Sequence, residues 1–551
     1  MPGGPPGPSE EAQSPVPDPH RRVLLMARLV SVIAVAMVSL RFAWLSDDAL
    51  ITVRTVLNAL HGYGPVFNVD ERVMGYTHPL WMALLTVAGA VTGDVILAPM
   101  LLGTVLTVVA WAVIVASVTS VSRLAVGTVA ILLCNSIVEY SAAGLENPLA
   151  FVFLAGLIVL GRQAGRLRRP DDDPAEDTGR ATILRALALG LLAAGTLLTR
   201  LDLILVIAPA LALVAWQMRR RPRFLVPFAV AWATPLALWA VIALAFYGEI
   251  LPSTFPAKTN LAIPRSELLF SGVNYLLVSF AFDPVALIIL VTALAWGIFA
   301  ADACCRSWLL GAGLYLVYVV WVGGDFMAGR FLAVPVFVAL AAMLTVPRDS
   351  YVALVPDQPP RSVARTASLV GCALLVLVGL GRADVLDPDL PNGPRWELTS
   401  AGGVADERGF YLVKGRSLAQ FLGSPLTRSG EFIDPEAFPE GWQPDIAQLR
   451  ATAASWRDGA GTEDVAIKCG GLGEAGISTG PAVHWIDPCG LTDRFLAAIP
   501  YRAEGFAWRI GHFDRPLPPG YLEAVEAVNP QLVEDPALRW ELERLWERIR
   551  P

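Results

Sequence analysis

Long apolar blocks separated by short polar segments dominate the chain up to about residue 384. A transmembrane helix needs about 20 apolar residues, and fewer when it is buried among other helices. The apolar stretches are residues 23–44, 78–93, 96–119, 122–141, 147–162, 182–199, 203–217, 224–246, 283–300, 307–322, 327–346 and 366–382. This pattern predicts an all-α polytopic membrane protein.

The two ends of the chain differ from the apolar blocks. Residues 385–551 are polar and rich in Trp, Pro and Gly, and are long enough for one domain of about 150 residues, for which we expect a mixed α/β fold. Residues 1–19 are too rich in Pro and polar residues to bury a core, and are predicted to be a disordered cytoplasmic tail. The transmembrane domain is therefore assigned to residues 20–384.

Arginine placement orients the predicted helices through the positive-inside rule. The segments expected in the cytoplasm are 20–22, 162–185, 219–223, 306 and 348–365. The segments expected to face outward are 45–77, 247–282, 323–326 and 385–551. A cytoplasmic N-terminus and an outward C-terminal domain require an odd number of crossings. We therefore predict about eleven transmembrane helices, with a broken or re-entrant helix between the loop 45–77 and the arginines of 162–185.

Composition and charge agree with this class. The chain of 551 residues is 55% hydrophobic and 17% charged, with a formal net charge of -7 and a mean hydropathy of +0.54. The acidic balance and the lack of basic runs outside the cytoplasmic loops argue against a nucleic-acid partner. We expect a monomeric, multi-pass protein of the plasma membrane that contacts the lipid bilayer.

Two adjacent acids, Asp47 and Asp48, directly follow the first apolar stretch. Ionisable groups at a membrane are costly and therefore indicate function, so both are candidate catalytic residues, with Asp48 the first choice. Ser46, Asp47 and Asp48 would also suit the N-cap of a helix that starts near Ala49. We therefore expect one acid to cap the helix while the other reacts.

Three further outward segments carry charged residues. Lys258 is the only lysine before the C-terminal domain, and its compact ammonium suits a phosphate, although a lysine that snorkels to the interface is the alternative. Asp325 and Arg330 lie on a second outward edge, and Arg200 and Asp202 on a third. The sequence thus predicts one outward face with both acids and bases.

This face suits a substrate with a lipid tail and a phosphate head, such as a sugar phosphate on a polyprenyl carrier. Lys258, Arg330 and Arg200 would stabilise the departing phosphate as the glycosidic bond breaks. A carboxylate would take a proton from an acceptor hydroxyl or stabilise an oxocarbenium-like centre. We expect no obligate metal or other cofactor, and a divalent cation on the acidic loop remains an open alternative.

Six blocks of the sequence occur in an informative order. They are DDALITVRTVLNALHGYGPVFNVDERVMGYTHPLW from Asp47, SAAGLENPL at 141–149, TRLD at 199–202, LPSTFPAK at 251–258, GGDFMAGRF at 323–331 and WRIGHFDRPLPPGY at 508–521. At these blocks the chain resembles the GT-C superfamily of polyprenyl-phosphate-sugar glycosyltransferases, and more narrowly the actinobacterial terminal β-(1→2)-arabinofuranosyltransferase family. The resemblance implies decaprenyl-phosphoryl arabinofuranose as donor and the ends of arabinan, in arabinogalactan or lipoarabinomannan, as acceptor.

The resemblance also implies roles for single residues. It makes Asp47 and Asp48 the catalytic acids. The residues expected at the substrate are Asn58, Glu71, Arg72, Tyr76, Thr77, His78, Glu146, Asp202 and Asp325. A solvated helix face is the alternative for Asn58, a membrane interface for His78 and a helix start for Glu146.

Other functions stay open at this point. The donor could instead carry another sugar, such as mannose. A transporter for lipid-linked sugars would usually show paired repeats and broken midplane helices, which the sequence lacks. A scaffold of the envelope would not explain acids and a lone lysine on one face. The sequence therefore favours a glycosyltransferase.

The C-terminal domain carries two further features. Cys469 and Cys489 are its only cysteines, so a disulfide is expected in an oxidising compartment, with a zinc site that includes His484 as the alternative. Its aromatic rings are expected to stack on acceptor sugars, and burial in the core is the alternative. The tryptophans concerned are Trp396, Trp442, Trp456, Trp485 and Trp508.

Overall fold

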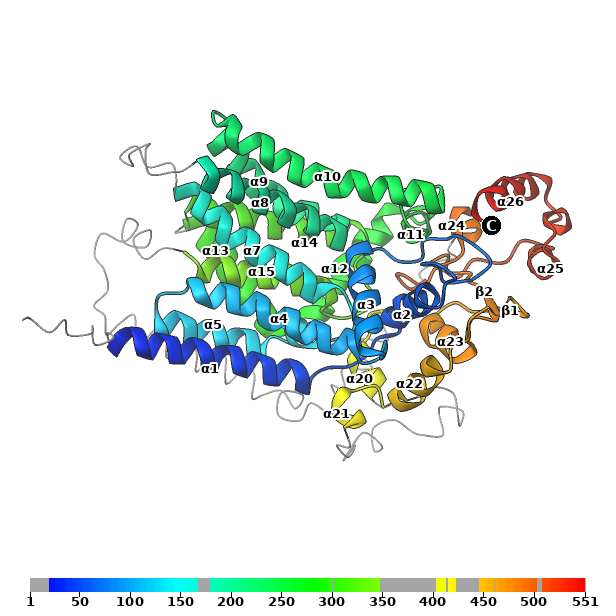
Figure 1. Cartoon of the computed structure of the whole chain (residues 1–551), viewed down its shortest axis with the longest axis horizontal. Helices are drawn as coiled ribbons and strands as arrows, with labels where there is room; N and C mark the ends of the chain where they lie inside the picture. The colour runs from blue at the N-terminus through cyan, green and yellow to red at the C-terminus, as the bar shows by residue number, and fades with distance from the viewer. Residues whose placement is uncertain are drawn as a thin grey trace, which may run out of the picture.

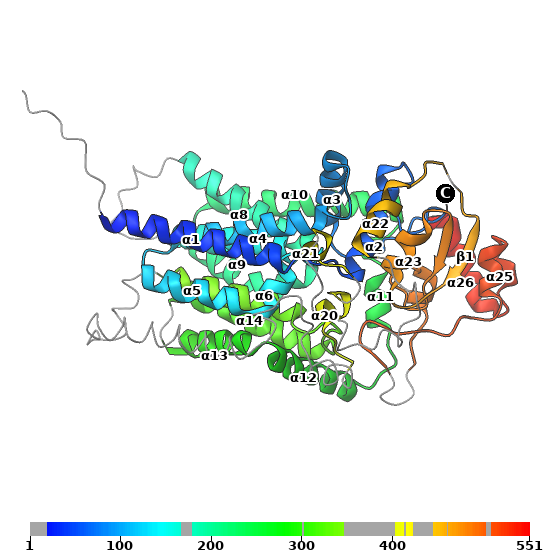
Figure 2. The ribbon, with the colours of Figure 1, turned by 90° about the horizontal axis from the view of Figure 1, so that it is seen from below.

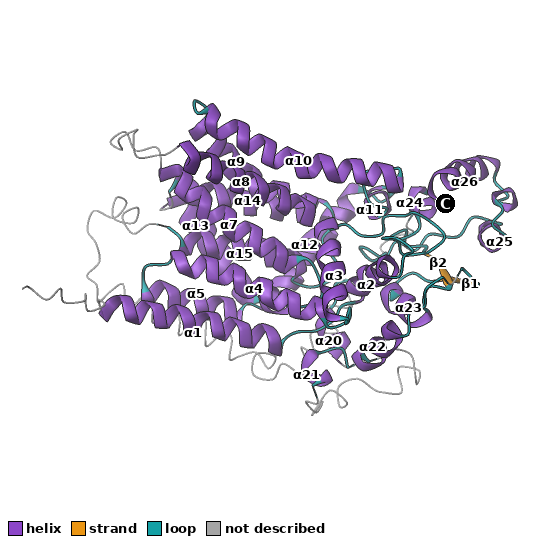
Figure 3. Cartoon of the chain, in the orientation of Figure 1, coloured by secondary structure: helices purple, strands orange, loops and turns teal. Residues whose placement is uncertain are grey.

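The computed structural model describes residues 19–166, 179–299, 302–346, 403–412, 415–422, 445–459, 461–502 and 508–550. Most of these residues are helical, and the long helices run side by side along the long axis of the molecule (Figures 1 and 3). The elements that follow residue 403 gather at one end of this bundle, together with α2 (Asp47–Leu60) and α11 (Thr254–Thr259) (Figure 2). The predicted tail up to residue 18, the stretch 366–382 and the domain boundary near 384 lie outside the described residues.

Apart from α12, the bundle is built from the predicted apolar stretches. Its helices are α1 (Pro19–Arg41), α3 (Pro79–Thr92), α4 (Ala98–Ser117), α5 (Val121–Leu133), α7 (Asn147–Arg166), α8 (Gly179–Thr199), α9 (Ile204–Met218), α10 (Pro222–Tyr247), α12 (Arg265–Phe282), α13 (Pro284–Phe299), α14 (Ala303–Trp321) and α15 (Ala333–Leu344). Among the described residues, six helices are long and apolar enough to cross a membrane, or up to eight if each of two bent pairs is one span. The chain is thus a multi-pass membrane protein, and the number of about eleven crossings stays a prediction.

Both bent pairs break at the same place in the fold. The first, α5 followed by α6 (Asn135–Val138) and the 3-10 turn η1 (Glu139–Ser141), bends by 72°, and the second, α12 followed by α13, bends by 110°. The buried Asp283, which lies at the second break, accepts hydrogen bonds from Ser136 N at the first (2.7 Å) and from Ala286 N (3.1 Å). A backbone N–H that loses its helical partner needs another one in an apolar setting, and this carboxylate supplies it.

The prediction that 247–282 forms a loop was wrong, because this range contains α11 and the 18-residue α12. That the segment faces outward stays a prediction. The apolar residues of α12 are interrupted by Glu267, Ser271 and Asn274, so no continuous apolar run marks it. The signal lies instead in its buried stripe, Leu268, Gly272, Tyr275, Ser279 and Phe282, whose spacing of three and four residues is that of one helix face.

The described part of the C-terminal region is a set of short elements at the end of the bundle. They are α20 (Glu407–Leu412), α21 (Leu418–Phe421), α22 (Ile446–Ala454), β1 (Asp464–Ile467), α23 (Leu472–Thr479), β2 (Val483–Ile486), α24 (Arg494–Ala498), α25 (Tyr521–Glu526), η6 (Pro530–Leu532) and α26 (Pro536–Ile549). The two strands pair in parallel, from Asp464 with Val483 to Ile467 with Ile486. Helices and strands thus both occur here.

The tryptophans of this region belong largely to its core. Trp456 and Trp485 are buried, and their indole N–H groups donate to Asn58 Oδ1 (3.2 Å) and Thr479 Oγ1 (3.1 Å). The prediction that these two rings stack on acceptor sugars was therefore wrong, because burial leaves them no free face. Trp508 is half-buried and donates to Glu267 Oε2 at 3.3 Å. Trp396 and Trp442 lie outside the described residues.

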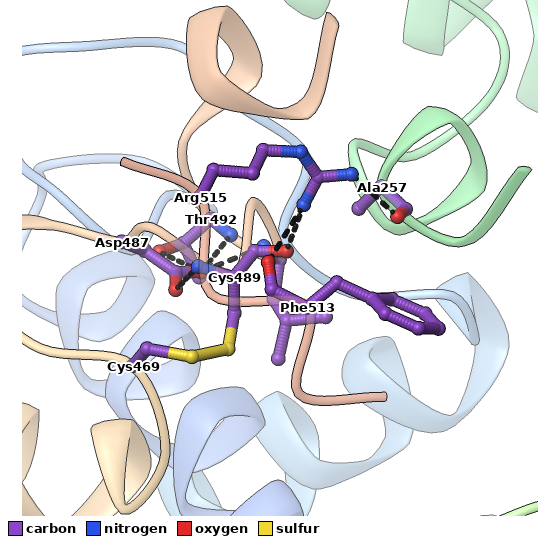
Figure 4. The surroundings of a disulfide bond; sticks show 8 residues. Ala257, Cys469, Asp487, Cys489, Thr492, Phe513 and Arg515 are labelled. Atoms are coloured by element: carbon purple, nitrogen blue, oxygen red, sulfur yellow. Dashed lines mark hydrogen bonds between the residues drawn. A yellow bond between two sulfur atoms is a disulfide. The ribbon is translucent and has the colours of Figure 1, made fainter. Parts of the chain in front are cut away.

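A disulfide joins Cys469 to Cys489, with a Cα–Cα distance of 5.2 Å (Figure 4). The zinc alternative finds no support, because His484 Nδ1 instead faces Asp70 Oδ1 at 2.8 Å. Beside the disulfide, Arg515 donates to Cys489 O (3.1 Å) and, through its other terminal nitrogen, to Ala257 O (2.8 Å). The disulfide loop is thus tied to α11.

The double variant Cys469→Ser, Cys489→Ser should lower the free energy of unfolding by about 2–4 kcal/mol, because the bond closes a long loop in the unfolded chain. Thermal unfolding of the purified protein measures this loss, and thiol labelling should find both cysteines oxidised in the native envelope. Cys304→Ser, at a free and half-buried cysteine, is the control. Equal unfolding temperatures of the double variant and the control would contradict a structural role for this disulfide.

Candidate active site

The helix predicted to start near Ala49 is α2, and its first turn positions the two acids Asp47 and Asp48. Ser46 is the N-cap, and its Oγ accepts a hydrogen bond from Ala49 N at 3.2 Å, a contact worth about 1 kcal/mol. Asp47 and Asp48 both lie in the first turn, where negative charge interacts favourably with the helix dipole. Neither acid is the cap, contrary to our expectation.

The two acids face different partners. Asp47 is buried, and its carboxylate oxygens accept hydrogen bonds from Gly473 N (3.0 Å) and Glu474 N (2.9 Å) at the start of α23. Asp48 instead places its Oδ2 2.9 Å from Arg330 Nη1, and its side chain keeps 27% of its surface exposed. Since both oxygens of Asp47 hold the C-terminal region, Asp48 is the better candidate for the chemistry.

Arg330 is the centre of the site. It begins the 3-10 turn η3 (Arg330–Leu332) directly after Gly329, which has φ 77°. Besides Asp48, its guanidinium lies 3.7 Å from Asp325 and 3.9 Å from Glu146. One cation thus faces three carboxylates, which come from the start of α2, the residue before α7 and the segment before η3.

The turn that carries Asp325 and Arg330 depends on glycine. Gly324 has φ 85°, in the left-handed region, where residues with a Cβ are rare. A Cβ at this position would also lie 2.4 Å from Tyr275 Cβ of α12. The sequence GGD therefore lets the chain pass against α12 and return towards the site.

Glu146 extends the network to two more elements. Its carboxylate lies 3.6 Å from Arg200 Nη1, between α8 and α9, and 3.6 Å from His78 Nδ1, just before α3. Burial acts to raise the pKa of Glu146, but the electrostatic interactions with His78, Arg330 and Arg200 outweigh it and hold that pKa at about 2. Glu146 is therefore a permanent anion, and it orders the cations around it.

Arg200 is already neutralised by its neighbour. Its Nε and Nη2 donate to the two carboxylate oxygens of Asp202 at 3.1 and 2.6 Å, a bidentate geometry that is among the stronger ion pairs. Tyr315 of α14 joins them, since its hydroxyl accepts from Arg200 Nη2 (2.9 Å) and donates to Asp202 Oδ2 (3.0 Å). Arg200 is thus better placed to position Glu146 than to bind a phosphate.

We call these seven side chains the carboxylate–arginine cluster: Asp48, His78, Glu146, Arg200, Asp202, Asp325 and Arg330. Burial lowers the pKa of His78, although Glu146 opposes this effect, and the ring hydrogen-bonds to Thr52 Oγ1 at 2.8 Å. Burial raises the pKa of Asp325, while the charges of Arg330 and Lys258 lower it. Lys258 is exposed on α11, and its charge reaches this cluster.

Several buried polar atoms of the site have no hydrogen-bond partner among the described residues. They are Ser136 Oγ, Glu146 Oε2, Asn147 Nδ2, Asp325 Oδ2 and Arg330 Nε. Buried polar groups are nearly always satisfied by protein, water or ligand, so this group of atoms is suited to a polar substrate. Within the described ranges, no group of three or more His, Cys, Asp or Glu side chains could hold a metal ion.

The remaining residues predicted at the substrate do not belong to the cluster. Thr77 adjoins it through His78, and the others have partners elsewhere. Asn58 is buried and donates to Val66 O and Phe67 O. Glu71 is buried and accepts from Asn68 Nδ2 at 2.9 Å. The others are Arg72, exposed over the Phe246 ring, Tyr76, whose hydroxyl bonds to Tyr247, and Thr77, exposed beside His78. The structure gives Asn58, Glu71 and Tyr76 internal partners rather than a place in the cluster.

Two residues near the cluster were not predicted from the sequence. Tyr315 lies inside an apolar stretch, and its hydroxyl group was the only signal in the sequence of a polar contact there. Glu407 on α20 is buried, and its pKa is affected by the charges of Asp48 and Asp325. It follows a long polar segment, and no pattern in the sequence marks it.

Comparison with known proteins gives the following relations. No protein-family profile matches the chain. A protein of Mycobacterium tuberculosis named terminal β-(1→2)-arabinofuranosyltransferase is 28% identical over 538 residues, which cover 87% of this chain and 82% of that protein. A protein of the same name from Corynebacterium glutamicum is 28% identical over 351 residues, which cover 55% of this chain and about half, 48%, of that relative.

Comparison with solved structures finds matches of low similarity, including the following two. ArnT from Cupriavidus metallidurans, bound to undecaprenyl phosphate, is 12% identical with a TM-score of 0.49, over 85% of this chain and 86% of that one. Arabinosyltransferase EmbB from Mycobacterium smegmatis is 12% identical with a TM-score of 0.33, over 74% and 41%. At this level of similarity neither structure indicates what this chain does. The chain is, over most of its length, a homologue of a protein named terminal β-(1→2)-arabinofuranosyltransferase.

Proposed function

We propose that this chain is a membrane glycosyltransferase of the GT-C type that moves arabinofuranose from decaprenyl-phosphoryl arabinofuranose to the ends of cell-wall arabinan in β-(1→2) linkage. The homology supports the activity. The observation that carries the proposal is the carboxylate–arginine cluster at one end of an apolar bundle, where Arg330 faces three carboxylates. Such a site offers both a cation for a phosphate and carboxylates for a sugar.

Asp48 is assigned to the sugar. It is the most exposed carboxylate of the cluster, at 27% of its side chain against 16% for Asp202. A carboxylate at the anomeric carbon stabilises the positive charge that develops there as the bond to the phosphate breaks. Its contact with Arg330 holds it in place, since an ion pair with little exposure fixes both side chains.

Lys258 and Arg330 are assigned to the donor phosphate. The Nε of Arg330 is buried without a hydrogen-bond partner among the described residues, and Lys258 is exposed while its charge still acts on Asp325. Both cations would gain a partner as negative charge grows on the leaving phosphate. Arg200, predicted at the phosphate from the sequence, is assigned instead to positioning, because Asp202 already occupies its guanidinium.

A lipid-linked donor and an outward site agree with the distribution of charge and apolar surface. The end of the bundle opposite the cluster carries Arg162, Arg306 and the arginines of 219–223, which favour the cytoplasmic side. Apolar side chains of α1 and α10 are exposed along the bundle, as expected for helices that face lipid. The proposed active site then lies at the outer membrane surface, where a polyprenyl tail can stay in the bilayer.

A transfer assay tests the proposal directly. Purified protein in lipid nanodiscs is given a short arabinan acceptor and, in separate reactions, polyprenyl-phosphate arabinofuranose, mannose and glucose. We expect extension of the acceptor by one pentose from the arabinofuranose donor alone, detected by mass and linkage analysis. Extension by a hexose would assign another donor, and movement of intact donor across the bilayer without any transfer would indicate a transporter.

Lys258→Ala should raise the KM for the donor by about ten-fold or more, because a hydrogen bond to a charged group contributes about 1.5–3 kcal/mol. The KM for the acceptor should change little. Lys258→Arg, which keeps the charge, is the matched control. Arg330→Ala is a less specific test, since it would leave Asp325 and Glu146 buried without this cation. A normal donor KM together with weaker acceptor binding in Lys258→Ala would reverse the assigned roles.

A further inference from the structure

One segment crosses the end of the bundle that holds the cluster, between the two loops that lead into Asp48 on α2 and Arg330 on η3. We call residues 403–412 and 415–422 the crossing segment. Near its start, Ala405 N donates to Phe326 O at 2.6 Å, and near its end, Leu418 N donates to Ala43 O at 3.0 Å. These backbone contacts fix α20, which lies between them in the chain, over the region between the two loops.

Glu407 is the first residue of α20 and is 8% exposed. Its Oε1 accepts a hydrogen bond from Arg509 Nη2 at 3.2 Å, and Arg509 also donates to Gly403 O at 3.0 Å. Burial raises the pKa of Glu407 to about 8; Arg509 opposes this shift, and the negative charges of Asp48, Asp47 and Asp325 add to it. Glu407 therefore lies within electrostatic reach of the proposed catalytic acid.

The other carboxylates around the site are poorly suited to accept a proton. Both oxygens of Asp47 accept backbone N–H groups, and Asp202 is held by Arg200 and Tyr315. Asp325 is 4% exposed, accepts a hydrogen bond from Phe326 N and faces Arg330 through its other oxygen. The pKa of Glu146 lies at about 2, so this group binds a proton very weakly. General-base catalysis is most efficient when the pKa of the base is close to the working pH, and Glu407 meets this condition.

We propose that Glu407 is the general base that takes the proton from the acceptor hydroxyl. This inference rests on the proposed function, in which a hydroxyl attacks the anomeric carbon of a phosphate-linked sugar. The hydroxyl oxygen forms the new bond to that carbon while its proton passes to the Glu407 carboxylate. The bond from the carbon to the phosphate oxygen breaks, and its electron pair leaves with the polyprenyl phosphate. Glu407 then returns the proton to water.

In this assignment two carboxylates have different roles in the reaction. Asp48, held against Arg330, acts on the anomeric carbon of the donor, and Glu407 acts on the hydroxyl of the acceptor. Arg509 lies over Glu407 with 38% of its side chain exposed, so the acceptor would approach past this guanidinium. The titratable and charged groups that act on Glu407 or are acted on by it are Asp47, Asp48, Asp325, Arg509, Tyr140, Tyr411 and Arg416.

The pH dependence of kcat/KM for the acceptor tests the inference, because the base acts only when it is deprotonated. In the wild-type protein the rate should rise with pH and level off above about pH 8, which is the pKa of this group. Glu407→Gln should lower the rate by about 10²–10⁴-fold and lose this rise, while the KM for the donor stays near normal. A Glu407→Gln protein with the wild-type pH profile would overturn the inference.

Two variants keep the test decisive if Glu407→Gln folds poorly. Arg509→Gln leaves Glu407 in place but removes the cation that lowers its pKa, so the rise should move to higher pH; an unchanged profile would overturn the inference. Glu249→Gln is the matched control, since Glu249 also pairs with an arginine, Arg494, at 2.7 Å outside the cluster. The profile is measured with whichever sugar donor the wild-type protein uses, so an error in the proposed sugar does not affect it.

Discussion

Asp48→Asn should lower the turnover number by about a thousand-fold while the protein remains folded. The substitution keeps the shape of the side chain and removes the charge that would stabilise the anomeric carbon, a type of contribution that is worth about 10²–10³ in kcat when a preorganised group is lost. Arg330 still faces Asp325 and Glu146 in the variant, so the cluster should keep its geometry. The measurement is kcat at saturating donor and acceptor, with the unfolding temperature recorded in parallel.

Asp458→Asn is the control for Asp48→Asn. Asp458 also pairs with a basic side chain, His61, but it is 81% exposed and far along the chain from the cluster. Its loss should leave turnover unchanged. Wild-type turnover in Asp48→Asn would remove Asp48 from the mechanism.

Arg54→Met should destabilise the packing between α2 and the C-terminal region by about 3–5 kcal/mol, because each buried carbonyl that loses its donor costs about 1–3 kcal/mol. Arg54 is fully buried, and its guanidinium donates to Phe67 O (2.8 Å), to Val483 O (2.9 Å) and to Gly476 O. Methionine fills a similar volume but leaves these three carbonyls without their donor. Limited proteolysis of the residues after 445, together with thermal unfolding, measures the loss.

Arg72→Met is the matched control, because Arg72 lies on the loop that follows α2 but is exposed over the Phe246 ring. It should change the unfolding temperature little. Equal protease resistance of Arg54→Met and Arg72→Met would show that Arg54 does not hold the two parts together. Because of these contacts, deleting the C-terminal region would also destabilise α2. Single substitutions are therefore the more specific test of the active site.

The helices of the bundle were predictable because each is an apolar run bounded by polar residues. The exception, α12, buries only one face, and its stripe from Leu268 to Phe282 carries the signal that a search for continuous runs does not detect. The bend between α5 and α6 falls in the region where a broken or re-entrant helix was predicted. That prediction followed from the distribution of arginines, which required an odd number of crossings there. The described elements after residue 403 are short, and their packing on α2 depends on contacts such as that of Asp47 with α23, which no local pattern encodes.

The residues of the cluster were predictable for a simple geometric reason. Asp48, Glu146, Arg200 and Arg330 all lie at ends of apolar stretches, and helix ends on the same side of a membrane share one surface. Asn58 and Glu71 were misplaced because the direction of a side chain on α2 or its loop depends on what packs there. Glu407 is brought to the site by the crossing segment, and its place could be seen only in the folded chain.

A structure of the protein with a phosphonate analogue of decaprenyl-phosphoryl arabinofuranose tests the roles assigned to Asp48, Arg330 and Lys258, since such an analogue binds without being cleaved. We expect the phosphonate within hydrogen-bonding distance of Arg330 and Lys258, with the anomeric carbon beside Asp48 and the lipid tail along the bundle. A phosphonate bound elsewhere would contradict these roles, for example in the cavity of about 230 Å³ near Arg162 and Asp302 at the opposite end of the bundle.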